Sequence, residues 1–194
     1  MVISFTGFVL FLSTASGTVL AHIDTPFQQV RVIENEIDGT HVRLVKTGVL
    51  GTQCGMAFED DVVRVDVSVT TYLTGFLLGM HTELPAPRVA MLGGCVYVLP
   101  RAFLKDYPQA EITAVEIDPG MTMIAREWFQ LPADPGFTIH HEDARVFLNR
   151  AVREGMSLDL IFFDAYTTFG TPPYHLVTKE SFTAAHQVLG ESGV

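Results

Sequence analysis

Short apolar strands alternate with helical segments in the second half of the chain, and this alternation restricts the fold more than any other feature. Runs of apolar and β-branched residues predict the strands, and apolar residues at helical spacing predict the helices. The predicted strands are 88–92, 112–117, 137–140 and 158–163, and the predicted helices are 99–105, 121–129, 144–153 and 178–189. This pattern is typical of an α/β protein with a Rossmann-like, doubly wound parallel sheet that binds ligands at the carboxyl ends of its strands.

The residues before Pro87 follow a different pattern. Apolar and polar residues alternate over 27–46, and the turn signal Asp38-Gly39 separates the two halves, which predicts a β-hairpin. Alternation over 63–69 predicts a further strand. A small β-rich region is therefore expected ahead of the parallel sheet.

The N-terminal segment is apolar and carries no Asp, Glu, Lys or Arg before Asp24. We expect an apolar helix over 1–22 that is either associated with a membrane or buried against protein. A signal peptide ending at Ala21 is the alternative, although no basic residue precedes the apolar run.

The division of the chain follows from these patterns. We expect a small β-rich domain over 23–84 and a nucleoside-binding, Rossmann-like domain over 85–194. A further strand is expected to begin where the sequence stops at Val194. Because an apolar sheet edge is rarely left exposed, we expect either that C-terminal strands are missing or that a partner chain, such as a second copy in a homo-oligomer, covers the edge.

The composition limits the classes of partner that the chain is expected to bind. The formal net charge is -10 and the pI is about 5.0, which argues against nucleic acid, because nucleic-acid affinity depends largely on cationic contacts. A neutral or cationic small molecule fits better. The two cysteines, Cys54 and Cys95, indicate neither a disulfide framework nor a Cys-rich metal site, and favour a reducing, cytoplasmic location.

Two candidate ligand contacts follow the first two strands of the predicted sheet. Gly93 and Gly94 form the turn after the first strand, where glycines let the backbone approach a nucleotide-type ligand. Glu116 ends the second strand and could accept hydrogen bonds from both hydroxyls of a ribose. The alternatives are a tight turn without a ligand and, for the nearby Asp118, a helix N-cap.

The third and fourth strands also end in carboxylates. Asp143 could bind an adenine amino group, cap the helix that begins at Ala144, or do both. Asp164 and Tyr166 follow the fourth strand, where a catalytic group is expected. No metal is expected, because the neighbouring His140 and His141 would point to opposite faces of a strand.

These segments together resemble the spermidine synthases, the polyamine aminopropyltransferases, and in particular divergent bacterial members of that family. The resemblance rests on the order and spacing of PRVAMLGG, AVEIDPGMTMIAREWF, HHEDARVFL, and DLIFFDAY followed by PPYHLVTKESF. It implies a fold of the S-adenosylmethionine-dependent methyltransferase type and a decarboxylated S-adenosylmethionine cosubstrate. The implied cosubstrate contacts are Gly93, Gly94, Glu116, Asp143 and Ala144, with Asp164 as the catalytic residue and Tyr72 and Tyr166 on the side of the amine substrate.

The chain departs from the family at positions that bear on activity. Cys95, Val96 and Tyr97 stand where the family usually has further glycines and an aspartate, and Thr167 stands where it has an acid. The sequence is therefore consistent with three functions: an aminopropyltransferase of polyamine biosynthesis, an S-adenosylmethionine-dependent methyltransferase, and a non-catalytic binding module.

Overall fold

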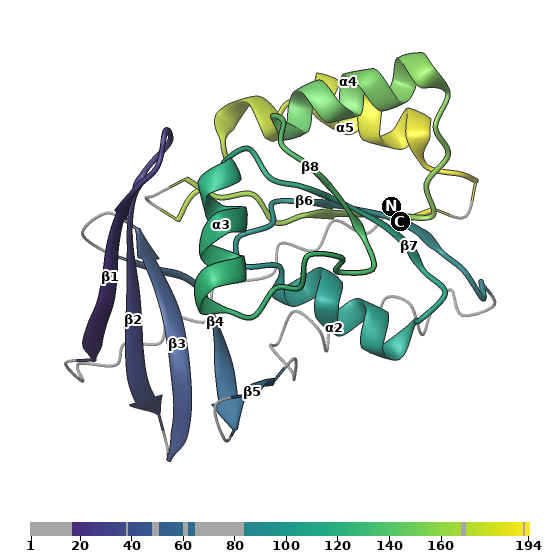
Figure 1. Ribbon diagram of the computed structural model, residues 1–194. Helices are drawn as coiled ribbons and strands as arrows, with labels where there is room; N and C mark the ends of the chain where they lie inside the picture. The colour runs from purple at the N-terminus through teal and green to yellow at the C-terminus, as the bar shows by residue number, and fades with distance from the viewer. Residues whose placement is uncertain are drawn as a thin grey trace.

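The protein consists of an antiparallel β-sheet near the N-terminus and a parallel β-sheet flanked by helices, one of which lies between the two sheets (Figure 1). The computed structural model describes residues 17–37, 39–47, 51–59, 62–64, 84–167, 170–191 and 193–194. The predicted fold class, α/β with a Rossmann-like parallel sheet after a small β-domain, is confirmed.

The first sheet is antiparallel, with its described strands in chain order. Its strands are β1 (Thr18–Asp24), β2 (Gln29–Ile37), β3 (Thr40–Thr47), β4 (Gly51–Glu59) and β5 (Val62–Arg64). The predicted hairpin corresponds to β2 and β3, which pair from Val30 with Thr47 to Ile37 with Thr40. Gly39 takes a positive φ of 75° at the turn, a conformation that glycine adopts without steric cost.

The expected N-terminal helix is wrong for residues 18–22, because they belong to β1. This strand pairs with β2 from Thr18 with Glu34 to Asp24 with Gln29, so backbone hydrogen bonds to a neighbouring strand determine its conformation. Residues 1–16 of that expectation lie outside the described residues, as do 65–69 of the predicted strand over 63–69. Within the described part of the chain, no helix is long and apolar enough to cross a membrane.

The second sheet is parallel and has the strand order β8-β7-β6-β9. Its elements run β6 (Arg88–Leu92), α2 (Val98–Asp106), β7 (Glu111–Val115), α3 (Pro119–Trp128), β8 (Thr138–His140), α4 (Ala144–Glu154), β9 (Leu160–Phe163), the 3-10 helix η1 (Tyr174–Leu176) and α5 (Lys179–Val188). The first strand β6 lies between β7 and β9, so the direction of winding reverses there. Ligands of doubly wound sheets bind at such a reversal, beyond the carboxyl ends of the strands.

Helices cover both faces of the parallel sheet. On one face, α4 and α5 pack on β6 and β7 through a core that includes Phe147, Leu148 and Val188. On the other face, α2 packs on β6 and β9 through Phe103 and Met91. Figure 1 shows α4 and α5 together on one side and α2 on the other.

Side chains at the helix starts account for the local chain direction. Asp118 caps α3 by accepting a hydrogen bond from the Gly120 N–H at 2.9 Å, and Pro119 follows in the first turn. Asp143 caps α4 by accepting from the N–H groups of Arg145 and Val146. Both caps begin a helix directly after a strand of the parallel sheet, which fixes the positions of the neighbouring loops.

The antiparallel sheet packs on α3 and closes one side of the parallel sheet. Val32, Val45 and Phe58 from the antiparallel sheet share a buried core with Met121 and Ile124 of α3. Polar contacts hold both ends of α3: the Thr25 hydroxyl donates to Asp118 at 2.6 Å, and the Arg43 guanidinium donates to the Trp128 carbonyl at 2.6 Å. The two sheets therefore form one packed structure.

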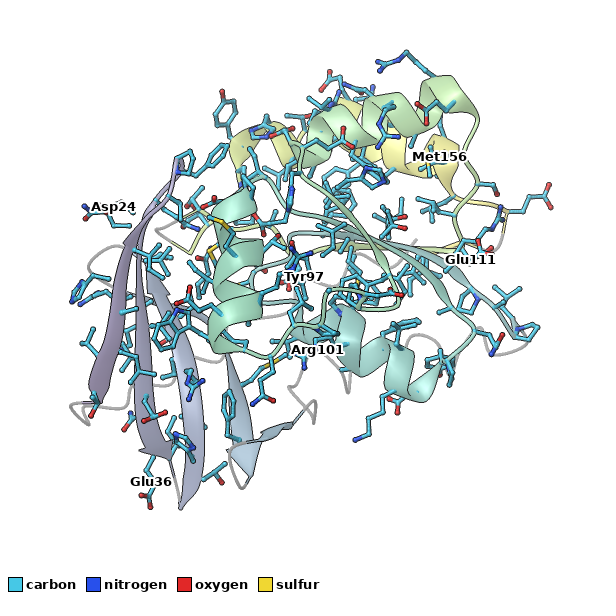
Figure 2. All side chains as sticks on the ribbon, in the orientation of Figure 1. Asp24, Glu36, Tyr97, Arg101, Glu111 and Met156 are labelled. Atoms are coloured by element: carbon cyan, nitrogen blue, oxygen red, sulfur yellow. A yellow bond between two sulfur atoms is a disulfide. The ribbon has the colours of Figure 1, made fainter. Side chains whose placement is uncertain are left out.

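A disulfide between Cys54 of β4 and Cys95 also joins the two sheets. It is drawn as a yellow sulfur-sulfur bond in Figure 2. Two cysteines alone indicated no disulfide framework and favoured a reducing location, so this single bond was not expected from the sequence. The residues are 41 positions apart in the chain, and the packing of the antiparallel sheet brings their Cα atoms to 6.5 Å, within the range that a disulfide can span.

Candidate nucleoside and transfer site

The loops after β6 and β9 meet at the reversal point of the parallel sheet. Asp164 donates its backbone N–H to the Leu92 carbonyl at 2.8 Å, and Gly93 donates its N–H to the Val115 carbonyl at 2.8 Å. Gly93 has a φ of 108°, and a Cβ atom added there would lie 2.4 Å from the Asp164 carbonyl oxygen. Gly93 and Asp164, predicted separately from two strand ends, are thus in direct backbone contact.

Glu116 lies at the centre of this edge and is buried. Its carboxylate accepts three backbone hydrogen bonds at 2.9 Å, from the N–H groups of Gly94, Cys95 and Asp118. Burial raises the pKa of Glu116, while these three donors oppose the shift. Three donors leave part of the acceptor capacity of a carboxylate unused, so the side chain can stabilise the loop and still accept a ligand hydroxyl.

The residues that follow the two glycines fill the interior beside this loop, because the side chains of Val96 and Tyr97 are buried there. Cys95 and Tyr97 both have positive φ values, 45° and 60°. Tyr97 is fully buried and lies in the interior of the molecule (Figure 2), where its hydroxyl is 2.5 Å from Thr122, which in turn is 2.8 Å from His141. The Tyr97 ring also limits the space beside Gly94, because a Cβ atom there would come within 2.7 Å of it.

Asp143 caps α4, which is one of the two roles that the sequence left open, and it also contacts a histidine. Besides capping α4, its second oxygen is 2.9 Å from Nε2 of His175 in η1. Ala144 is the first residue of α4 and is buried. Sequence reasoning missed His175, because only the fold brings the residues after β9 back to the start of α4.

Asp164 has a half-buried carboxyl group. Burial raises its pKa from 3.8 to about 6, and no hydrogen bond or charge from the described residues contributes to the shift. This differs from Glu116 and Asp143, whose carboxylates have several partners. A carboxyl group with a raised pKa in a loop at a sheet edge is a candidate proton acceptor.

The neighbouring residues define the sides of the site. The carbonyl of Tyr166 accepts a hydrogen bond from the side chain of Gln53 at 3.5 Å, so β4 reaches the loop that follows Asp164. Thr167 contacts Thr171 through both its N–H and its hydroxyl. Tyr72, the other predicted substrate residue, lies outside the described residues.

Histidines near the site contact protein groups. His140 lies 3.8 Å from Glu142, and His141 contacts Thr122. The described ranges contain no group of three His, Cys, Asp or Glu side chains with the geometry for a metal ion.

Curated relatives of two kinds match the sequence. A polyamine aminopropyltransferase from Vibrio vulnificus is 32% identical over 123 residues, which cover 63% of this chain and 41% of the relative. The eEF1A lysine and N-terminal methyltransferase homolog of Drosophila melanogaster is 30% identical over 92 residues, which cover 45% of this chain and 14% of the relative. The chain therefore spans about two fifths or less of the length of these relatives. No protein-family model matches the sequence.

Solved structures support the same fold. The probable spermidine synthase of Corynebacterium glutamicum has a TM-score of 0.64 at 22% identity, over 89% of this chain and 61% of that one. The resemblance to the spermidine synthases is confirmed. A spermidine synthase in complex with the transition-state analogue AdoDATO has a TM-score of 0.60 at 20% identity, over 90% of this chain and 56% of that one. Human methyltransferase-like protein 13 in complex with SAH has a TM-score of 0.55 at 22% identity, over 63% of this chain and 62% of that one.

Proposed function

We propose that this spermidine synthase-like protein transfers the aminopropyl group of decarboxylated S-adenosylmethionine to an amine. The observation that carries the proposal is the carboxyl group of Asp164, which lies at the reversal point of the sheet and has no hydrogen-bond partner among the described residues. The relatives and solved structures named polyamine aminopropyltransferase or spermidine synthase support it. The net charge of -10 suits a cationic substrate.

The cosubstrate would bind across the carboxyl ends of β6, β7 and β8. Glu116 would accept a hydrogen bond from a ribose hydroxyl, since three N–H groups occupy all but about one of the roughly four acceptor sites of its carboxylate. Asp143, at the start of α4 beside Ala144, would accept a hydrogen bond from the adenine amino group. Gly93 and Gly94 would let the chain approach the nucleoside closely.

The reaction is a displacement at carbon. The amine nitrogen attacks the methylene carbon next to the sulfonium, the new carbon-nitrogen bond forms as the carbon-sulfur bond breaks, and the sulfur leaves with both electrons in neutral methylthioadenosine. An alkylamine with a pKa near 10.4 arrives protonated and must lose that proton before it attacks. Asp164 would orient the ammonium group and accept its proton, with Tyr166 beside the amine.

Methyl transfer from S-adenosylmethionine is the second candidate, and the methyltransferase relatives favour it. The same Glu116 and Asp143 would hold its adenosine. The two cosubstrates differ in the methionyl carboxylate, which needs a cation or N–H donors that the decarboxylated form does not.

Parallel titrations of the full chain with methylthioadenosine, S-adenosylmethionine and decarboxylated S-adenosylmethionine test the proposal. We expect binding of all three with preference for the decarboxylated form, followed by release of methylthioadenosine when a diamine is added. Preference for S-adenosylmethionine would support methyl transfer. No detectable binding of any of the three compounds would support a non-catalytic module.

Glu116→Gln is expected to weaken nucleoside binding by about tenfold or more, because hydrogen bonds to a charged group are each worth about 1.5–3 kcal/mol. The neutral amide keeps the size of the side chain and one acceptor oxygen. Calorimetric titration with methylthioadenosine measures the effect. Glu111→Gln, a change at an exposed residue at the opposite end of β7, is the matched control, and equal affinities in the two variants would remove Glu116 from the site.

The rate of transfer is expected to fall as the pH drops below about 6, because the pKa of Asp164 is raised to about 6 by burial and a protonated carboxyl cannot accept a proton. Values of kcat/KM, which report the titrating groups of the free enzyme, measure this acidic limb. A rate that stays constant between pH 7 and pH 5 would contradict the role of Asp164.

A further inference from the structure

The Cys54–Cys95 disulfide attaches the glycine loop of the proposed nucleoside site to the antiparallel sheet. Cys95 lies directly after Gly94, and its backbone N–H donates to Glu116 at 2.9 Å. Its partner Cys54 lies on β4, which belongs to the other sheet. The covalent bond is therefore one residue from the glycines and one hydrogen bond from the carboxylate proposed to bind ribose.

The same stretch of β4 also reaches the opposite side of the site. Gln53, next to Cys54, donates from its side-chain amide to the carbonyl of Tyr166, two residues after Asp164. Consecutive residues of β4 thus contact the loop after β6 and the loop after β9. The position of β4 relative to the parallel sheet therefore affects both the nucleoside end and the transfer end of the site.

The conformation of Cys95 gives the disulfide a role in the shape of the loop. Cys95 has a φ of 45°, in the left-handed region that residues other than glycine rarely adopt. The bond to Cys54 restrains the residue in this conformation and directs its N–H toward Glu116. Once the bond is broken, Cys95 can move to a more favourable backbone conformation, and Glu116 loses a fixed donor.

We propose that the Cys54–Cys95 disulfide is a redox-controlled positioning element of the nucleoside site. In the oxidised protein the bond holds the glycine loop and Glu116 in the arrangement that binds ribose. In the reduced protein the loop must be ordered by the ligand, which lowers the affinity. The inference rests on the proposed nucleoside-binding function and adds its regulation.

The chemical step is a thiol-disulfide exchange with a dithiol reductant. One thiolate of the reductant attacks a sulfur of the protein disulfide, the second thiol resolves the mixed disulfide, and the reductant leaves as its own disulfide. Two electrons and two protons pass to the sulfurs of Cys54 and Cys95.

The test is a titration of the full chain with methylthioadenosine before and after reduction with dithiothreitol. Alkylation of free thiols, counted by mass spectrometry, reports the state of the two cysteines. We expect the reduced protein to bind about three- to tenfold more weakly, an effect of the size expected for ordering one loop, and reoxidation to restore the affinity.

Two variants separate the bond from the individual side chains. Cys54→Ser and Cys95→Ser are each expected to bind methylthioadenosine as weakly as the reduced protein does. Their affinities should be the same with and without dithiothreitol. Thermal melting of every form, with titrations well below the lowest melting temperature, keeps loss of folding apart from loss of affinity. If either variant fails to fold, the reduced and reoxidised protein alone provide the comparison.

The possible outcomes distinguish this inference from the function on which it rests. Equal affinities of the oxidised and reduced proteins, or free thiols in the air-oxidised protein, would overturn the redox inference and leave the nucleoside site intact. Absence of binding in both states would overturn the proposed function itself. Tighter binding after reduction would overturn the inference that the bond pre-organises the loop.

Discussion

Asp164→Asn is expected to lower the turnover of aminopropyl transfer by about a hundred- to ten-thousand-fold, the usual contribution of general-base catalysis. The amide keeps the size of the side chain but cannot accept the ammonium proton. Nucleoside affinity is expected to stay nearly unchanged, because the proposed role of Asp164 is at the reacting amine, whereas the proposed adenosine contacts are Glu116 and Asp143. Single-turnover release of methylthioadenosine and calorimetric titration measure the two quantities separately.

The pH dependence of stability gives Asp164→Asn a second readout that does not depend on activity. The folded pKa of Asp164, about 6, lies above its ordinary value of 3.8. The folded state therefore retains a proton that the unfolded chain releases, and this stabilisation is complete below about pH 3.8 and is lost as the pH rises through 6. The variant should lack this component in denaturant unfolding between pH 4 and pH 6.

The exposed Asp106→Asn change at the end of α2 is the matched control for both readouts. Comparable turnover of the wild type and Asp164→Asn would mean that Asp164 only shapes its loop. A stability profile that is the same in the variant and the wild type would mean that the carboxyl titrates normally.

The parallel sheet could be predicted from the sequence because its elements are locally determined. Each predicted strand and helix after Pro87 lies within two residues of the observed bounds at either end. Buried strands such as β6 are continuous apolar runs, and Asp118, Asp143 and Thr178 cap the helices that follow them. These signals act over a few residues and do not need the rest of the fold.

The N-terminal part was harder to predict because strand pairing is non-local. The absence of charge before Asp24 favoured a helix, yet Thr18, Val19 and Ile23 are β-branched residues that pair with β2. Strand preference depends on the neighbouring strand that the segment contacts. No pattern within the segment indicates that neighbour.

The site was predictable to the extent that it consists of strand ends. Glu116 directly follows β7 and Asp164 directly follows β9, so both lie at the edge formed by the carboxyl ends of the parallel strands, where the sequence placed them. The contacts of Cys54 with Cys95 and of His175 with Asp143 connect residues that are distant in sequence. They depend on how the antiparallel sheet and η1 pack against the parallel sheet, and spacing alone carries no signal for that packing.

Gly93→Ala is expected to destabilise the protein by about 3 kcal/mol or more, because it combines backbone strain with a steric clash. Gly93 has a φ of 108°, and the new Cβ atom would lie 2.4 Å from the carbonyl oxygen and 2.7 Å from the carbonyl carbon of Asp164. Backbone atoms cannot move aside as a flexible side chain can. Denaturant unfolding, followed by circular dichroism, measures the loss.

Gly155→Ala is the matched control, since Gly155 also has a positive φ, 64°, but no heavy atom lies within 4 Å of the added Cβ. It should cost only about 1–2 kcal/mol, the strain of a left-handed conformation. The difference between the two variants isolates the contact between the loops after β6 and β9. If Gly93→Ala cost no more than Gly155→Ala, the two loops would have room to separate, and the close approach of Gly93 to Asp164 would not be a constraint on the site. If the expected difference is found and the variant still folds, relief of the clash must displace Asp164, so turnover should fall as well.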